Sequence, residues 1–302
     1  MYQNHLNHKH QSVVKTFIYF DIFNYPLKLN EVIKFCSIKI NTLELERLIS
    51  DLIINNIISF KNEFYFLTGN NESIIGKRYD NEQRAKKIER KVKRYSKIIS
   101  SFPFVEAVCI SGSFSKGVLD LDGDIDYFII TKPDRLWLSR TLLILFKKIF
   151  LFNSKKYFCV NYFIDTNTLV TPDKNIYTAT EVSTLIPVNN IKLFTDFVNA
   201  NKWVYDQFPN LKEVRKSAYF DNKKRVFTQI FEKILSGKIG TKLDNYFFKI
   251  TVKTWQKRFP DFNTIDFELN MRSKKSVSKH HPQGFQAKVL NEVESRFKKY
   301  NF

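Results

Sequence analysis

The chain has 302 residues, 43% of them hydrophobic, and its 49 Lys and Arg against 30 Asp and Glu give a formal net charge of +19. This length and hydrophobic content exclude a disordered protein and allow two or three domains. The charge permits a nucleic-acid partner but does not require one. Lys, Asn, Ile and Phe are all abundant, as expected of a proteome with AT-rich codons, so much of the charge carries no functional message.

Cysteines and apolar runs bear on the location of the protein. Cys36, Cys109 and Cys159 stand singly among apolar residues without a CxxC pair, so the pattern predicts neither a disulfide framework nor a zinc module. The longest apolar run, 142–146, is far shorter than the roughly 20 residues that a spanning helix needs, and the first residues lack the apolar segment of a signal peptide. We therefore expect no membrane span and a reducing, cytoplasmic location.

The first segment, residues 1–75, reads as a helical module closed by a hairpin. Apolar spacing predicts helices over 12–23 and 30–36, and Asn41 can cap a third helix, with Glu44 at the capping-box position. The apolar face expected for this third helix consists of Leu43, Leu48, Leu52 and Ile53. Two short strands follow, at 58–60 and 64–67. The order resembles a winged helix-turn-helix, by pattern alone.

That resemblance raises the question of DNA binding. The third helix presents Glu44, Glu46 and Asp51 against the single Arg47, and DNA phosphates repel such a surface. We expect this module to serve in packing or protein contact, and a DNA-binding regulator is kept as an alternative function.

The second segment, residues 76–170, predicts an α/β core, and the third, 171–302, reads as mostly helical. A basic amphipathic helix over 76–101 opens the core. Its expected buried face is formed by Ile88, Val92, Tyr95 and Ile99. Alternating strands and a helix follow, with strands at 106–112, 125–131 and 156–164 and a helix at 135–151.

An acidic loop leads into the second of these strands. Asp124 and Asp126 are two residues apart at the strand start, so their side chains project from the same face. Two adjacent carboxylates repel each other, and oxygen-only ligands suit Mg²⁺. We therefore predict a site for Mg²⁺ (or Mn²⁺) there. An EF-hand is excluded because the sixth loop position from Asp122 is Tyr127 and not glycine.

A glycine turn precedes this loop. Gly112 allows the backbone to approach a phosphate, Ser113 can donate to it, and Lys116 supplies a cation, although the run lacks the spacing of a P-loop. Together with Asp124 and Asp126, this pattern resembles the catalytic signature of the DNA polymerase β nucleotidyltransferase superfamily over about residues 104–165. The resemblance implies a small mixed sheet flanked by helices, with Ser113 holding the triphosphate, Lys116 assisting it and the two aspartates binding the metals.

The superfamily usually adds a third carboxylate on a later strand, as metal ligand and base. Asn161 stands at the position that aligns with it; it can coordinate a metal through its carbonyl but cannot act as a base. We predict Asp165 as the first candidate for the catalytic carboxylate and Glu181 as the second.

These features predict transfer of a nucleoside monophosphate from an NTP to an unidentified acceptor, with pyrophosphate leaving. The acceptor can be a small molecule, a protein or a nucleic acid. Asn161 favours an alternative from another class, a nucleotide-binding sensor without catalysis. The loop that carries His280 and His281 either folds back over the phosphates or is an ordinary exposed connection.

Overall fold

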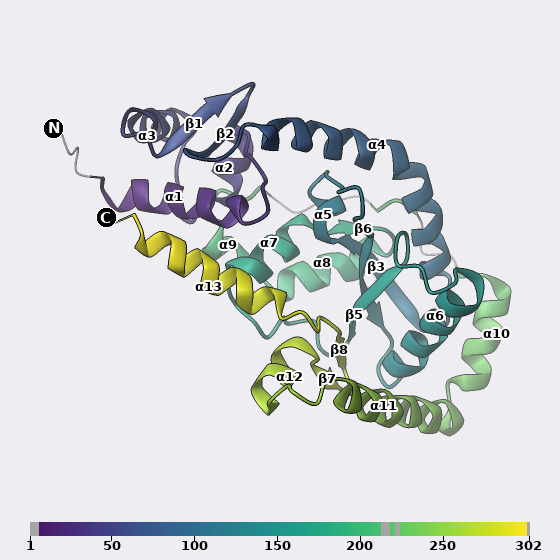
Figure 1. The fold of residues 1–302 in the computed structure, drawn as a ribbon. Coiled ribbons are helices and arrows are strands. Elements are labelled where there is room, and N and C mark those ends of the chain that lie inside the picture. The colour runs from purple at the N-terminus through teal and green to yellow at the C-terminus, as the bar shows by residue number, and fades with distance from the viewer. Residues whose placement is uncertain (1–5, 213–217, 221–223, 301–302) are drawn as a thin grey trace.

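A computed structural model of the chain describes residues 6–212, 218–220 and 224–300. These residues form a mixed α/β fold with one six-stranded sheet, in the order β6-β3-β4-β5-β8-β7, and a separate two-stranded sheet, β1-β2 (Figure 1). The α/β class predicted from the sequence is thereby confirmed. The more specific nucleotidyltransferase and winged-helix arrangements stay predictions.

The N-terminal elements occur in the predicted order. They are α1 (His8–Asp21), α2 (Leu29–Phe35), α3 (Thr42–Ile54), β1 (Ile58–Lys61) and β2 (Phe64–Leu67). The Asn41 side chain accepts a hydrogen bond from the Glu44 amide at 2.9 Å, so the predicted cap of α3 is confirmed.

The expected buried face of α3 was partly wrong. Leu48 and Leu52 are buried, but Leu43 is 70% exposed and Ile53 39% exposed. Leu45 and Ile49 complete the buried stripe instead. The reason is that α1 and β1 pack on the side of α3 that carries Leu45, and a stripe at spacings of three and four from this residue excludes Leu43.

The large sheet is built from both halves of the chain. Its strands are β3 (Val105–Ser111), β4 (Asp126–Thr131), β5 (Cys159–Asp165), β6 (Ile186–Pro187), β7 (Ser273–Lys274) and β8 (Val277–Lys279). Only β4 and β5 pair in parallel; the other neighbours are antiparallel. Thus β6, β7 and β8 come from the region beyond residue 170, for which the sequence predicts mostly helices.

Ten helices follow α3 in the described part of the chain. They are α4 (Ser73–Ser100), α5 (Gly112–Ser115), α6 (Leu136–Phe150), α7 (Ile176–Thr184), α8 (Ile191–Ala200), α9 (Trp203–Gln207), α10 (Val226–Leu235), α11 (Lys238–Arg258), α12 (Thr264–Asn270) and α13 (Phe285–Lys298). The predicted apolar face of α4 is confirmed, since Val92 and Ile99 are fully buried and Ile88 and Tyr95 pack beside them. No described helix is long and apolar enough to cross a membrane.

Alternation along the central strands separates two hydrophobic cores. Phe128 and Ile130 of β4 belong to a core that includes residues of α1, α7, α8 and α13, whereas Tyr127 and Ile129 belong to one that includes residues of α4, α6 and α11. Each face of the sheet is therefore covered by helices that are distant in sequence.

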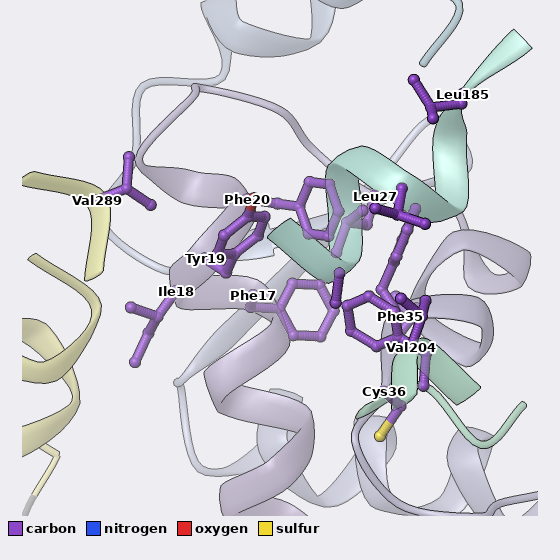
Figure 2. Packing of buried hydrophobic residues seen from close by; sticks show 14 of the residues in the cluster. Phe17, Ile18, Tyr19, Phe20, Leu27, Phe35, Cys36, Leu185, Val204 and Val289 are labelled. Atoms are coloured by element: carbon purple, nitrogen blue, oxygen red, sulfur yellow. The ribbon is translucent and has the colours of Figure 1, made fainter. Parts of the chain in front are cut away.

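The first core joins the N-terminal module to the C-terminal region. Figure 2 shows Phe17 and Phe20 of α1 beside Phe35 of α2 and Val204 of α9, with Val289 of α13 also in the cluster. Burial of such large side chains contributes roughly 1.5–3 kcal/mol each. This packing joins α1 and α7 to the core on the sheet face that carries Phe128 and Ile130.

Candidate active site

The two predicted aspartates meet at one end of the sheet. Asp126 is the first residue of β4 and lies between Ser111 of β3 and Cys159 of β5 in the strand register. Asp124 stands two residues earlier. Ligand atoms of Asp124, Asp126 and Cys159 all lie within 4.8 Å of one another. The structure thus brings the predicted carboxylate pair together and adds a thiol.

The carboxylate pair lacks an ion-pair partner in the part of the chain that the structure describes. No cation among the described residues lies within 4.0 Å of the carboxylate of either Asp124 or Asp126. Burial, and after it the charge of Asp124, raises the pKa of Asp126 to about 7. Burial and the two aspartates also raise the pKa of the Cys159 thiol, which therefore stays protonated beside the carboxylates.

These donors fit a hard divalent cation. Two carboxylates supply the oxygen ligands that Mg²⁺ and Mn²⁺ prefer, and a cation would relieve their repulsion. A protonated thiol is not a ligand for such an ion, so Cys159 borders the predicted site without belonging to the metal ligands.

Asn161 lies beside Asp126 but presents a donor to it. Its Nδ2 donates to Asp126 Oδ1 at 3.1 Å. To act as the predicted metal ligand, Asn161 would have to rotate its amide so that the carbonyl oxygen faces the ion. The predicted metal ligand Asn161 therefore contributes a hydrogen bond to Asp126 in this structure.

Gly112 is required where the turn approaches Asp126. Its φ is +67°, and a Cβ built there would lie 2.5 Å from Asp126 Oδ2. Gly117 also has a positive φ, of +82°, but a Cβ there meets nothing within 4 Å. Both positions have a backbone conformation that favours glycine, and only Gly112 also needs the space.

This contrast predicts different outcomes for two alanine variants. Gly112→Ala and Gly117→Ala should each lower the free energy of unfolding by roughly 1–2 kcal/mol through the left-handed backbone. Only Gly112→Ala should also displace the Asp126 carboxylate and weaken Mn²⁺ binding, measured by paramagnetic relaxation of water protons. Equal Mn²⁺ affinities in the two variants would contradict the close approach.

Lys116 and Glu181 pair across the glycine turn. Lys116 Nζ donates to Glu181 Oε1 at 2.7 Å and to the Gly112 carbonyl at 3.1 Å. The Gly112 amide donates to Glu181 Oε2 at 3.2 Å. A carboxylate from α7 thus pairs with Lys116, which the sequence assigns to a phosphate, and also accepts from the Gly112 amide. Ser113 lies beside them in α5 on the wall of the same cavity.

Asp165 does not lie in this site. It pairs with Thr131 at the opposite end of the parallel β4–β5 ladder, five residues along from Asp126, which corresponds to about 16 Å. Its carboxylate accepts from the Asn167 amide at 3.0 Å and is buried. The structure therefore gives the predicted catalytic residue a local role in the turn after β5.

A cavity of about 1180 Å³ contains the site, and the His280–His281 loop forms part of its wall. The His280 amide donates to the Asn161 carbonyl at 3.0 Å, which joins the loop to β5. Burial, reinforced by nearby cations, lowers the pKa of His280 to about 3 and that of His281 to about 4, so both are neutral. His280 and His281 are therefore half-buried in the cavity wall, and contact of this loop with phosphates stays a prediction.

The raised pKa of Asp126 predicts a pH-dependent stability. Because the folded state holds this proton up to about pH 7 and an unfolded aspartate releases it near 3.8, the stability contributed by this group falls as pH rises between these values. At pH 8 the free energy of unfolding of Asp126→Asn should exceed that of wild type by roughly 1–3 kcal/mol, and the difference should vanish toward pH 4. Thermal unfolding in EDTA from pH 4 to 8 measures this, and a pH-independent difference would contradict it.

Two contributors to the site were missed in the sequence. Cys159 precedes Asn161 by two residues on one strand, so the two-residue period of a strand could have predicted that both side chains lie on the same face of the sheet. Tyr25, whose hydroxyl donates to the Lys116 carbonyl at 3.1 Å, carries no such signal because it comes from the N-terminal module.

Comparison with known proteins adds no assignment, since no family model, no curated protein and no solved structure matches the chain.

Proposed function

We propose that the protein is a nucleotidyltransferase, dependent on Mg²⁺ or Mn²⁺, that transfers a nucleoside monophosphate from an NTP to an acceptor and releases pyrophosphate. The observation that carries the proposal is the pair of carboxylates Asp124 and Asp126, which has no ion-pair partner among the described residues and lies beside the Gly112 turn and Lys116 in one cavity. Nucleotidyl transfer needs these groups, namely metal ligands next to donors for phosphate oxygens. The likeness of the motif to the polymerase β superfamily supports the same function.

Each side chain then has a defined task. Asp124 and Asp126 would hold the metal, which when bound supplies neutralisation of the phosphate charges. The Gly112 amide, the Ser113 hydroxyl and the Lys116 ammonium donate to phosphate oxygens. The new bond forms between the acceptor atom and the α-phosphorus while the bond to the β-phosphate bridging oxygen breaks. Pyrophosphate leaves, and the acceptor proton passes to a base.

Glu181 is the carboxylate that fits the role of this base. Its charge contributes to the raised pKa of Asp126, so it lies close to the proposed metal site. Its present partners, Lys116 and Gly112, are donors that the triphosphate needs. Nucleotide binding would therefore release Glu181 from these donors and leave a free carboxylate in the cavity to accept a proton.

A nucleotide-binding sensor is the second candidate, and Asn161 favours it. An amide at this position cannot take a proton from the acceptor, and it already donates to Asp126. In a sensor, the same cavity would bind NTP without turning it over.

Pyrophosphate release tests the proposal. Wild type should release pyrophosphate from at least one of the four NTPs, with Mg²⁺ or Mn²⁺ and a cell extract as acceptor source. Asp124→Asn should abolish the release, and Asp165→Asn, at the far end of β5, should retain it. Release that is absent from wild type but gained in Asn161→Asp would reject the enzyme in favour of the sensor.

A further inference from the structure

The cavity extends beyond the aspartates to two buried cations of α6. Arg140 and Lys147 are seven residues apart on this helix, which places them on the same side, and both line the cavity. They are only 8% and 7% exposed. Neither has an ion pair with a described residue within 4.0 Å, and the buried Arg140 Nε has no hydrogen-bond partner.

Buried cations without counter-charge are costly, and here their neighbours increase the cost. Lys148, Lys155 and Arg258 line the same cavity, and none of them pairs with a described carboxylate. The charges of Lys155, Arg140 and Lys148 lower the pKa of Lys147, after burial itself. Such an arrangement is stabilised when an anion enters, because the anion supplies both the missing charge and the missing hydrogen-bond acceptors.

The Arg140 guanidinium is also held in position. It lies 4.7 Å from the centroid of the Trp255 ring, and Trp255 in turn contacts His280 at 4.7 Å between ring centroids. Burial lowers the pKa of Arg140 to about 10, so the group is charged at neutral pH. A fixed, planar guanidinium suits recognition of a carboxylate or phosphate through two parallel hydrogen bonds.

The position of these cations indicates whether they would contact the nucleotide or the acceptor. In the sheet order β3-β4-β5, the Gly112 turn follows β3 on one side of Asp126, whereas β5, against which α6 packs from the sheet face that carries Tyr127, lies on the other side. In nucleotidyl transfer, the leaving pyrophosphate and the attacking atom lie on opposite sides of the α-phosphorus. Phosphates held at the Gly112 turn therefore place the acceptor on the side of β5 and α6.

We propose that Arg140 and Lys147 form an anion subsite that binds a phosphate or carboxylate group of the acceptor. The assignment to the acceptor rests on the proposed function, whereas the existence of an anion site does not. The acceptor is then a molecule that carries an anionic group apart from the atom that attacks the nucleotide.

Binding of two probe anions tests the subsite. Inorganic phosphate and malonate are titrated calorimetrically in EDTA into wild type, Lys147→Gln, Arg140→Lys, Lys116→Gln and Lys87→Gln. Lys87 is exposed on α4 and controls for the loss of one charge. Lys116→Gln removes the cation assigned to the nucleotide. Far-ultraviolet circular dichroism and thermal unfolding confirm that each variant is folded.

We expect wild type to bind at least one anion at a single site. Lys147→Gln should weaken this binding roughly 10- to 100-fold, and Arg140→Lys, which keeps the charge but loses the planar fork, should weaken it as well. Lys87→Gln should bind like wild type, and Lys116→Gln should weaken the binding less than Lys147→Gln does. Failure of wild type to bind either anion, or equal affinity in Lys147→Gln, would overturn the subsite.

Nucleotide binding separates this proposal from the proposed function. Lys147→Gln should bind NTP with Mg²⁺ within about twofold of wild type, since its cation serves the acceptor. Parallel loss of anion and NTP affinity would overturn the assignment to the acceptor, because the α6 cations would then hold the nucleotide phosphates. If wild type binds the anion but no NTP, and Lys147→Gln binds the anion more weakly than wild type, the proposed function fails while the anion site stands.

Discussion

Replacing Asp124 and Asp126 together with asparagine is expected to abolish the effect of Mg²⁺ on NTP binding. In wild type, Mg²⁺ should strengthen NTP binding roughly 10- to 100-fold, because a cation held by the two carboxylates would neutralise phosphate charge. The double variant retains the shape of the site but offers no negative ligand. Calorimetric titration of NTP with and without Mg²⁺ measures this linkage for both proteins.

Two controls sharpen this experiment. Asp165→Asn should keep the full Mg²⁺ effect, because Asp165 lies at the other end of the β4–β5 ladder. Cys159→Ala should also keep it, because a protonated thiol beside the carboxylates is not a ligand for Mg²⁺. The central assignment would be lost if the double aspartate variant showed the same Mg²⁺ effect as wild type.

Replacing Glu181 with glutamine is expected to separate nucleotide binding from catalysis. The Glu181 side chain accepts hydrogen bonds from Lys116 and from the Gly112 amide, and the amide of a glutamine would bind these donors more weakly. Glu181→Gln should therefore raise NTP affinity about tenfold or more. The same change removes the proposed base and should lower the rate of pyrophosphate release roughly 10²- to 10⁴-fold. Binding is measured by calorimetry and the rate by release of pyrophosphate.

Lys116→Gln is the matched control for this variant. Lys116→Gln also breaks the ion pair between Lys116 and Glu181. It removes a donor to the phosphates, whereas Glu181→Gln removes a carboxylate that competes with them, so NTP affinity should fall. Unchanged NTP affinity in Glu181→Gln would show that Glu181 does not compete with the nucleotide. Tighter binding with an undiminished rate would show that it is not the base.

Local sequence determined the features of this protein that depend on near neighbours. The cap at Asn41 was predictable from a capping residue type just before a helical segment. The buried face of α4 and the carboxylates at the start of β4 were predictable because periods of three to four or of two residues decide which side chains share a face. The need for glycine at position 112 was visible in the same way. Its close contact with Asp126 gives this need a specific cause.

Tertiary structure alone decided which distant segments complete the site. The parallel register of β4 and β5 places Asp165 far from Asp126, although both stand at strand ends, and no spacing in the sequence shows which ends meet. Glu181 reaches the Gly112 turn only because α7 packs beside the start of β4 through the core shared with α1. Arg140 reads in the sequence as an ordinary basic residue bordering an apolar run. Its burial against Trp255 of α11 depends on helix packing that local periodicity does not encode.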